Sequence, residues 1–321
     1  MRPALLRTVL YVPGDRPDRV AKALVSGADC VVVDLEDAVA PERKAAARAG
    51  AVQGISGDRA PACAVGVRLN ALASGLLADD LAALAPVWSR LDVLLLPMTP
   101  DAGTVQQVAA LLDRVDGAAG PMLVPMIETA AGVLAAASIA AAGDRVLTLA
   151  LGPADLSAEL GLQLTPEGLE LLHVRSQLVL AAAAAGRIGP IDGPWLDVSD
   201  DAGLTAAATA ARRLGFSGMQ VLHPRQLPTV REAFAPSAAQ LTWARSVDAA
   251  FEEARARGVA SIRLPDGTFV DPPIAARARA LLAVAVPPPG PDRVTSDTAS
   301  AGRPSSILAG NRDTGVPRSE R

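Results

Sequence analysis

Short apolar runs alternate with longer amphipathic or Ala-rich segments along most of the chain. Short apolar runs are typical of buried strands, and longer segments with one apolar face are typical of helices. The predicted strands cover residues 8–12, 30–35, 62–69, 93–96, 121–128, 145–152, 186–191 and 218–222. The predicted helices lie between them, at residues 18–27, 43–52, 76–84, 105–115, 129–143, 169–185 and 205–214. This alternation predicts an α/β fold, a closed (β/α)₈ TIM barrel, with an open doubly wound sheet as the alternative.

The pattern changes after the last predicted strand. Residues 237–257 are amphipathic with mixed charge, residues 261–270 alternate around a Pro-Asp-Gly turn, and residues 272–283 begin a helix with proline. We therefore predict three parts: a barrel domain at residues 1–232, a C-terminal helical and hairpin extension at 233–285, and a polar, disordered tail at 286–321. Residues 258–284 are too short to bury a core of their own, so we expect the extension to pack as a lid on the barrel or on a neighbouring subunit.

Composition restricts the class of protein. Half of the 321 residues are hydrophobic and only 2% are aromatic, which predicts a large core of Ala, Val and Leu. A net charge of -4 argues against nucleic acid as a partner. Cys30 and Cys63 lie in separate apolar runs and are expected to be reduced core thiols. The chain offers no long uninterrupted apolar stretch, so we expect no membrane partner and a cytoplasmic location.

Two carboxylates follow neighbouring predicted strands. Glu128 ends the fifth strand and Asp155 comes just after the sixth, with one helix between the strands. The C-terminal ends of parallel strands lie at one edge of a sheet, about 4.8 Å apart, so these groups can meet at a hard cation such as Mg²⁺. The alternative is that Glu128 is a paired strand-end charge and that Asp155 caps a helix beginning near Leu156. Spacing alone does not decide between them.

Other charged residues gather at the same predicted rim. They follow the first three strands: Asp15 and Arg16; Asp34, Glu36 and Asp37; Arg68 and Asn70. An ion-pair network of Arg68 with Glu36 or Asp37 would explain the presence of any one of these pairs without a cation. The acids outnumber the arginine in the set, however, and a cation would balance them.

The loop after the first strand has features of an anion site. Gly14 provides a turn, a helix follows it, and Arg16 and Arg19 supply positive charge. An ordinary strand-to-helix loop with solvated charges is the alternative.

Seven motifs in order resemble the citrate lyase β-subunit-like family. They are Leu10-Tyr11-Val12-Pro13-Gly14, Val33-Asp34-Leu35-Glu36-Asp37-Ala38-Val39, Val67-Arg68-Leu69-Asn70, Leu96-Pro97-Met98-Thr99, Pro125-Met126-Ile127-Glu128-Thr129, Gly152-Pro153-Ala154-Asp155-Leu156 and His223-Pro224. The resemblance spans about residues 5–284. It implies a TIM barrel, usually a homotrimer, that binds Mg²⁺ (with Mn²⁺ as an alternative ion) and cleaves or forms carbon–carbon bonds in 3-hydroxyacyl-CoA thioesters such as malyl-, citramalyl- or citryl-CoA.

The resemblance also implies roles for individual residues. Glu128 and Asp155 match the metal ligands, Arg68 matches the arginine that holds keto-acid oxygens, and Glu36 and Asp37 match the acidic pair near the metal waters. The substrate-binding set implied for the acyl-CoA or keto acid also includes Gly14, Arg16, Arg19, Pro153 and Ala154.

Asp271 resembles the acid/base aspartate that family lyases present from a neighbouring subunit. From its sequence context alone, a turn or helix-capping role before Pro272 is the preferred interpretation. One position departs from the family: Met219 stands where a lysine usually follows the glycine before the His-Pro pair, which puts the identity of the acyl group in doubt.

Three other functions stay open. A hydroxy-keto-acid aldolase would use the same metal carboxylates but needs a histidine base near the first strands, and the histidines here are His173 and His223. A thioesterase acting on the same acyl-CoA would share every residue named above. A metabolite-binding descendant without activity is disfavoured, because the residues matching catalytic groups are retained.

Overall fold

The structure, a computed structural model, describes residues 6–116 and 120–285. Eight parallel strands form a closed barrel in which strand order follows the sequence and β1 pairs with β8. This confirms the predicted (β/α)₈ fold. The barrel strands are β1 (Thr8–Pro13), β2 (Cys30–Asp34), β3 (Ala64–Arg68), β4 (Val93–Leu96), β5 (Met122–Ile127), β6 (Ala150–Leu151), β7 (Ile191–Asp192) and β8 (Gly218–Val221).

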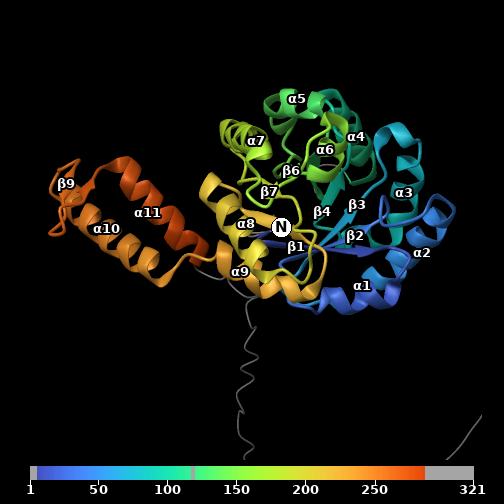
Figure 1. The fold of residues 1–321 in the computed structure, drawn as a ribbon, viewed down its shortest axis with the longest axis horizontal. Coiled ribbons are helices and arrows are strands. Elements are labelled where there is room, and N and C mark those ends of the chain that lie inside the picture. Colours follow the sequence, from blue (N-terminus) through green and yellow to red (C-terminus); the bar gives the residue numbers. More distant parts are fainter. Residues whose placement is uncertain (1–5, 117–119, 286–321) are drawn as a thin grey trace, which may run out of the picture. The chain divides into compact units, whose positions relative to one another are not determined.

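Helices surround the barrel strands (Figure 1). The α-helices are α1 (Pro17–Leu24), α2 (Lys44–Ile55), α3 (Leu77–Leu84), α4 (Ala102–Asp116), α5 (Ala130–Ala140), α6 (Pro153–Leu160), α7 (Leu172–Ala184), α8 (Asp201–Leu214) and α9 (Leu227–Phe234). Short 3₁₀ turns are η1 (Pro41–Arg43), η2 (Leu72–Ser74), η3 (Ala85–Arg90), η4 (Leu169–Leu171) and η5 (Pro224–Gln226).

Two apolar clusters lie on the two sides of the barrel sheet. Cys30 and Val32 belong to the cluster inside the barrel, whereas Val31 and Val33 pack between the sheet and the helices. This alternation follows from the two-residue period of a strand. Both faces of the sheet are buried, so the strands appear in the sequence as continuous apolar runs. Both cysteines are free and buried, as predicted.

Some element boundaries differ from the prediction. The seventh strand was predicted at residues 186–191 but consists of Ile191–Asp192. Strand β6 is equally short: most of the predicted segment 145–152 is buried, but only its last part pairs continuously with the neighbouring strands. Helix α6 begins at Pro153 and not near Leu156. Helix α9 was not predicted; it continues across residue 232, where the end of the barrel domain was placed.

The C-terminal extension contains α10 (Ala238–Ala256), the antiparallel pair β9 (Ile262–Arg263) and β10 (Phe269–Val270), and α11 (Pro272–Ala285). The predicted hairpin and proline-started helix are therefore present. An apolar cluster of its own holds these elements together, including Val247, Phe251 and Val270. The tail predicted to be disordered, residues 286–321, lies outside the described residues. Among the helices that the structure describes, none is long and apolar enough to cross a membrane.

Candidate active site

The candidate site residues of the barrel lie at the C-terminal ends of its strands. Asp34 is the last residue of β2 and Arg68 the last of β3, while Glu128 directly follows β5. Asp155 lies in the first turn of α6, which starts two residues after β6 ends. Because all barrel strands are parallel, these ends share one rim, the face that carries the active site in TIM-barrel enzymes.

Glu128 is a buried carboxylate with a single backbone donor among its described contacts. Glu128 is only 2% exposed, and its Oε2 atom accepts a hydrogen bond from the Met98 N–H at 2.6 Å. Burial raises the pKa of Glu128 to about 7; the Met98 N–H and Arg68 lower this pKa, and the charge of Asp155 raises it. Glu128 therefore interacts with both Arg68 and Asp155.

The backbone around Glu128 is shaped to its side chain. A Cβ atom at position 152 would overlap the Glu128 side chain, so only glycine fits there. Met98, which donates to the carboxylate, has a φ of 49°, in the left-handed region that non-glycine residues rarely adopt. Two segments therefore position the Glu128 carboxylate: Gly152 packs closely against it, and Met98 adopts a strained backbone conformation beside it.

Asp155 is exposed at this rim. Gly152 occupies the N-cap position of α6 and Pro153 is its first residue, so Asp155 is not the helix cap that the alternative interpretation required. Ala154 is exposed beside it. A carboxylate in the first turn is also favoured by the helix dipole. That local effect does not explain why a second carboxylate, Glu128, is buried nearby.

Asp34 fixes the Arg68 guanidinium. Arg68 Nε donates to Asp34 Oδ1 at 2.8 Å, and its Nη2 donates to Asp34 Oδ2, making a two-point contact between planar groups. Asp34 is 1% exposed and also accepts from the N–H groups of Glu36 and Ala38 at 2.8 and 3.1 Å. Sequence reasoning noted Asp34 at the rim but assigned Arg68 to Glu36 or Asp37. The strand register, in which Asp34 and Arg68 are direct partners, was the missing information.

The third nitrogen of Arg68 faces the acidic pair. Nη1 donates to Asp37 Oδ2 at 3.1 Å and lies 2.8 Å from Glu36 Oε2, which forms an ion pair without a hydrogen bond. Burial raises the pKa of Glu36 to about 8, while Arg68 lowers it and Asp37 raises it. The ion-pair alternative is therefore present, and it coexists with an excess of carboxylates over arginine.

The loop after β1 carries the candidate anion site. Gly14 has no space for a side chain, because a Cβ atom would lie within 3.0 Å of Leu35 Cδ2 and the Asp34 and Ala47 carbonyl oxygens. Arg16 is the N-cap residue of α1, and both Arg16 and Arg19 are exposed. Asp15 pairs with Arg43 at 2.7 Å, which leaves Arg16 more distant from that carboxylate, at 3.9 Å.

Asp271 and Met219 have local roles. Asp271 Oδ1 accepts a hydrogen bond from the Ile274 N–H at 3.1 Å, as expected for a residue that caps α11. Met219 is 1% exposed and packs in the cluster between sheet and helices. Its side chain therefore points away from the barrel interior, and the structure gives no contact through which it would select a substrate.

One of the two histidines, His223, lies at this rim, because it follows the C-terminal end of β8. His223 Nδ1 accepts from the Arg225 N–H and caps η5, and His173 is exposed on α7. Because the Nδ1 atom of His223 is engaged in this cap, His223 is a poor candidate for the base of a histidine-dependent aldolase.

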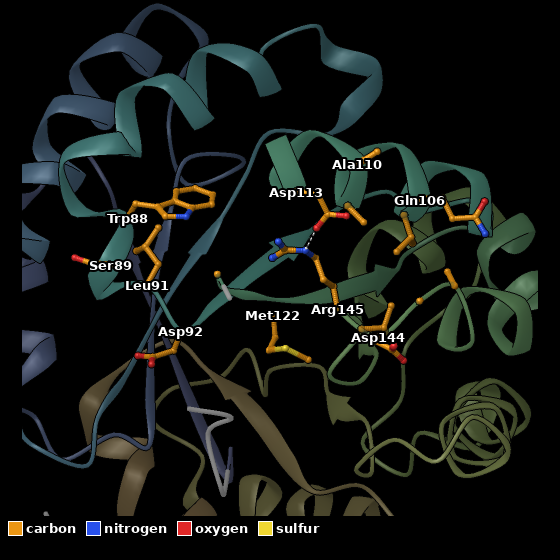
Figure 2. A pocket seen from close by; sticks show the side chains of 16 residues that line it. Trp88, Ser89, Leu91, Asp92, Gln106, Ala110, Asp113, Met122, Asp144 and Arg145 are labelled. Carbon is orange, nitrogen blue, oxygen red and sulfur yellow. Dashed lines mark hydrogen bonds and ion pairs between the residues drawn. The ribbon is translucent and has the colours of Figure 1, made fainter. Parts of the chain in front are cut away.

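A large cavity lies at the opposite end of the strands. It has a volume of about 990 Å³ and is lined by residues at the N-terminal ends of β4, β5 and β6 and on α4, including Asp92, Met122, Arg145 and Asp113 (Figure 2). Arg145 Nε donates to Asp113 Oδ1 at 2.6 Å, so the guanidinium is already paired. Since barrel chemistry occurs at the C-terminal ends of the strands, we place the candidate site at the Glu128 rim and not in this cavity.

The donor set fits Mg²⁺ with few protein ligands. Within residues 6–116 and 120–285, no group of three or more His, Cys, Asp or Glu side chains is arranged to hold a metal ion. Mg²⁺ commonly binds through one or two carboxylates and keeps several waters or substrate oxygens. Glu128 and Asp155, whose charges interact, provide two such carboxylates.

Comparisons with known proteins identify the family. The family model for HpcH/HpaI aldolase/citrate lyase matches residues 7–224. The chain is 39% identical to a citrate lyase subunit beta-like protein of Deinococcus radiodurans, over 87% of this chain and 97% of that protein. It is 35% identical to an L-malyl-CoA/beta-methylmalyl-CoA lyase of Cereibacter sphaeroides, over 78% of this chain and 86% of that one.

A solved structure supports the same assignment. CitE of Mycobacterium tuberculosis, in complex with magnesium, acetoacetate and coenzyme A, matches with a TM-score of 0.72 and 35% identity, over 88% of this chain and 99% of that chain. The predicted family is thereby confirmed. The chain belongs to the HpcH/HpaI aldolase/citrate lyase family, whose relatives named above include carbon–carbon lyases.

Proposed function

We propose that the protein is a Mg²⁺-dependent carbon–carbon lyase that cleaves, or forms, a 3-hydroxyacyl-CoA thioester, with an acyl-CoA and a keto acid on the other side of the reaction. The candidate substrates are malyl-CoA, citramalyl-CoA and citryl-CoA. The observation that carries the proposal is the position of three charged groups at one rim: Arg68 ends β3, Glu128 directly follows β5, and Asp155 lies in the first turn of α6 after β6.

Glu128 and Asp155 are the residues that would hold Mg²⁺. The bound ion would supply positive charge that polarises the keto and carboxylate oxygens of the substrate. The relative crystallised with magnesium, acetoacetate and coenzyme A supports this assignment. Glu36 and Asp37 would orient waters beside the ion, for which their carboxylates have the appropriate acceptor oxygens.

Arg68 would bind the keto-acid oxygens. Asp34 already occupies Nε and one side of Nη2, so the substrate would meet the remaining Nη2 proton and the Nη1 group now facing Glu36 and Asp37. Holding the guanidinium in a fixed plane reduces the rotational freedom that is lost when substrate binds. Pro153 and Ala154 would lie beside the same oxygens, in a helix turn whose free N–H groups favour an anion.

Asp271 would transfer the proton, from a neighbouring copy of the chain in a homotrimer. Loss of the hydroxyl proton allows the carbon–carbon bond to break, leaving a keto acid and a thioester enolate. A carboxylate that accepts this proton and returns it to the enolate carbon leaves the enzyme unchanged. Gly14, Arg16 and Arg19 would receive the phosphates of coenzyme A, because both arginines are exposed beside the first turn of α1.

Product analysis tests the proposal. The purified protein is incubated with Mg²⁺ and malyl-, citramalyl-, citryl- or hydroxymethylglutaryl-CoA, and the products are separated. An acyl-CoA with a keto acid is the expected result. Free coenzyme A with an intact hydroxy-diacid would identify a thioesterase instead, and no reaction with any of them would contradict the proposal.

Two variants test the metal assignment. Glu128→Gln and Asp155→Asn should each lose most Mg²⁺ affinity in calorimetric titration while the fold is retained, because removing one of two repelling carboxylates seldom destabilises a protein. Glu159→Gln, in the same helix as Asp155, is the matched control. Unchanged Mg²⁺ affinity in both site variants would rule out these ligands.

A further inference from the structure

Tyr11 lies inside the barrel, under the candidate site. It belongs to β1 and packs against the apolar cluster of the barrel interior. The Cζ atom of Arg68 lies 5.4 Å from the centre of the Tyr11 ring, which places the guanidinium over the aromatic face. The Tyr11 ring therefore packs against Arg68, the proposed substrate-binding arginine.

The Tyr11 hydroxyl has a poor partner. Within the part of the chain that the structure describes, its hydrogen bond is to Met126 Sδ, at 3.9 Å. A thioether is a weak acceptor, and Tyr11 is only partly buried, so the phenol can take a stronger acceptor from a bound ligand. Met126 precedes Glu128 by two residues in the β5 segment, so both side chains point to the same side of the sheet. The hydroxyl thus lies beside the residue just below the Glu128 carboxylate.

The phenol is a proton donor in this environment. Burial is the main cause that raises the pKa of Tyr11 well above its ordinary value; Asp34 and Glu128 raise it further and Arg68 lowers it. A protonated hydroxyl on the ring that packs against the Arg68 guanidinium matches an oxygen ligand that is charged or strongly polarised. Apolar packing against Arg68 would require only the ring of Tyr11 and not its hydroxyl group.

We propose that the Tyr11 hydroxyl donates a hydrogen bond to an oxygen of the keto acid held near Arg68, Glu128 and Asp155, and so contributes to substrate selection. This inference rests on the proposed lyase function. The competing explanation is that Tyr11 only fills the barrel and supports Arg68. Tyr11→Phe separates the two, because it keeps the ring and removes the single oxygen.

Ligand titration provides the test. Wild type and Tyr11→Phe are titrated with pyruvate and with oxaloacetate at saturating Mg²⁺, and separately with Mg²⁺ alone. Keto-acid affinity should fall about tenfold, as expected for loss of a hydrogen bond to a charged group. Mg²⁺ affinity and the thermal unfolding midpoint should stay unchanged, which a structural role would not predict. Equal keto-acid affinity in the two proteins would overturn the inference.

Met126→Leu is the matched control. It removes the sulfur acceptor with little change in volume, so keto-acid affinity should be retained. A loss as large as that of Tyr11→Phe would show that the Tyr11–Met126 contact acts structurally, and it would overturn the inference. A wild-type protein that binds neither keto acid with Mg²⁺ would contradict the proposed function as well, because the ligand of Tyr11 would then be missing.

Discussion

Arg68 illustrates how a single guanidinium is divided between structure and function. One edge of its planar group is bound by Asp34, and the other edge faces Glu36 and Asp37. Removing one partner of a buried ion pair lowers the free energy of unfolding by about 3–5 kcal/mol, several times more than removing one partner of an exposed pair. We therefore expect changes at Asp34 to affect stability as well as activity, and conservative changes at Arg68 to affect mainly activity.

The first prediction concerns Arg68→Lys. Lysine keeps the charge but loses the planar fork, so it cannot hold Asp34 and a substrate oxygen at the same time. Steady-state measurement should show kcat/KM reduced by about a hundredfold or more, equivalent to at least about 2.7 kcal/mol.

A second buried pair supplies the control for this prediction. Arg48 Nε donates to Asp80 Oδ1 at 2.7 Å, and Asp80 is fully buried. Arg48→Lys should lower the thermal midpoint with little change in kcat/KM. An Arg68→Lys variant with full activity would mean that Arg68 only balances the acidic rim.

At the residue scale, sequence reasoning located the acids and the arginine but not their partners. Glu128, Asp155 and Arg68 were recognisable because polar residues interrupt apolar runs at strand ends. The pairing of Arg68 with Asp34 depends on the register between β2 and β3, which no single run specifies. The sequence did not identify Tyr11 as a site residue, because tyrosine is common in strands. Only the contacts of its ring with Arg68 and of its hydroxyl with Met126 distinguish it.

At the scale of elements, the connection from β6 to α6 combines three requirements. Gly152 leaves room for Glu128, Pro153 starts the helix, and Asp155 follows in its first turn. Proline is favoured at this position because the first helical N–H groups have no partner within the helix. Sequence patterns placed the two carboxylates at one edge but started the helix too late, near Leu156, although the predicted strand ended at Gly152.

The second prediction follows from this connection. Gly152→Ala adds a Cβ atom where the Glu128 side chain lies, so the carboxylate must move. Mg²⁺ affinity should fall by about tenfold or more, and the free energy of unfolding should decrease by about 1–3 kcal/mol, the usual cost of overpacking. Calorimetric titration and denaturant unfolding measure the two effects.

Gly103→Ala is the control for the glycine change. It lies in α4, where the nearest atom to an added Cβ is Asp101 Oδ1 at 3.3 Å. Metal affinity should not change in this variant. If Gly152→Ala also binds Mg²⁺ normally, the position of Glu128 is not critical for the metal.

For the whole molecule, the raised pKa values make stability depend on pH. The pKa of Glu36 rises from 4.5 to about 8 and that of Glu128 from 4.5 to about 7, and burial also raises that of Asp192. Between the unfolded and folded pKa values, the folded protein binds more protons than the unfolded chain. Stability must therefore fall as pH rises across this range.

The third prediction is that the metal-free protein loses stability between about pH 5 and pH 8, measured by urea unfolding at each pH. Glu36→Gln should make the curve shallower, because this variant has no proton to lose. Glu253→Gln, at an exposed position of α10, is the control and should leave the slope unchanged. A slope that is the same in the wild type and in Glu36→Gln would contradict the contribution of Glu36.

The last prediction joins assembly to chemistry. Asp271 lies in an extension that has its own apolar cluster, and Asn is as good a helix cap as Asp, so Asp271→Asn should fold and bind Mg²⁺ while losing activity. Glu128→Gln should also be inactive, for lack of metal. If each active site combines one chain's rim with another chain's Asp271, hetero-oligomers of the two variants contain some intact combinations and should regain part of the wild-type activity.

Co-expression with two different tags, followed by isolation of the hetero-oligomers and assay with Mg²⁺ and the acyl-CoA, measures this recovery. Asp266→Asn in the hairpin turn is the matched control, since its Oδ1 accepts only a local hydrogen bond from Thr268 N at 2.8 Å and the variant should stay active by itself. Sequence and fold place Asp271 in the extension, and recovery of activity in the hetero-oligomers would show that it serves the barrel of a neighbouring chain. Verified hetero-oligomers without activity would show that Asp271 serves its own barrel or has no part in catalysis.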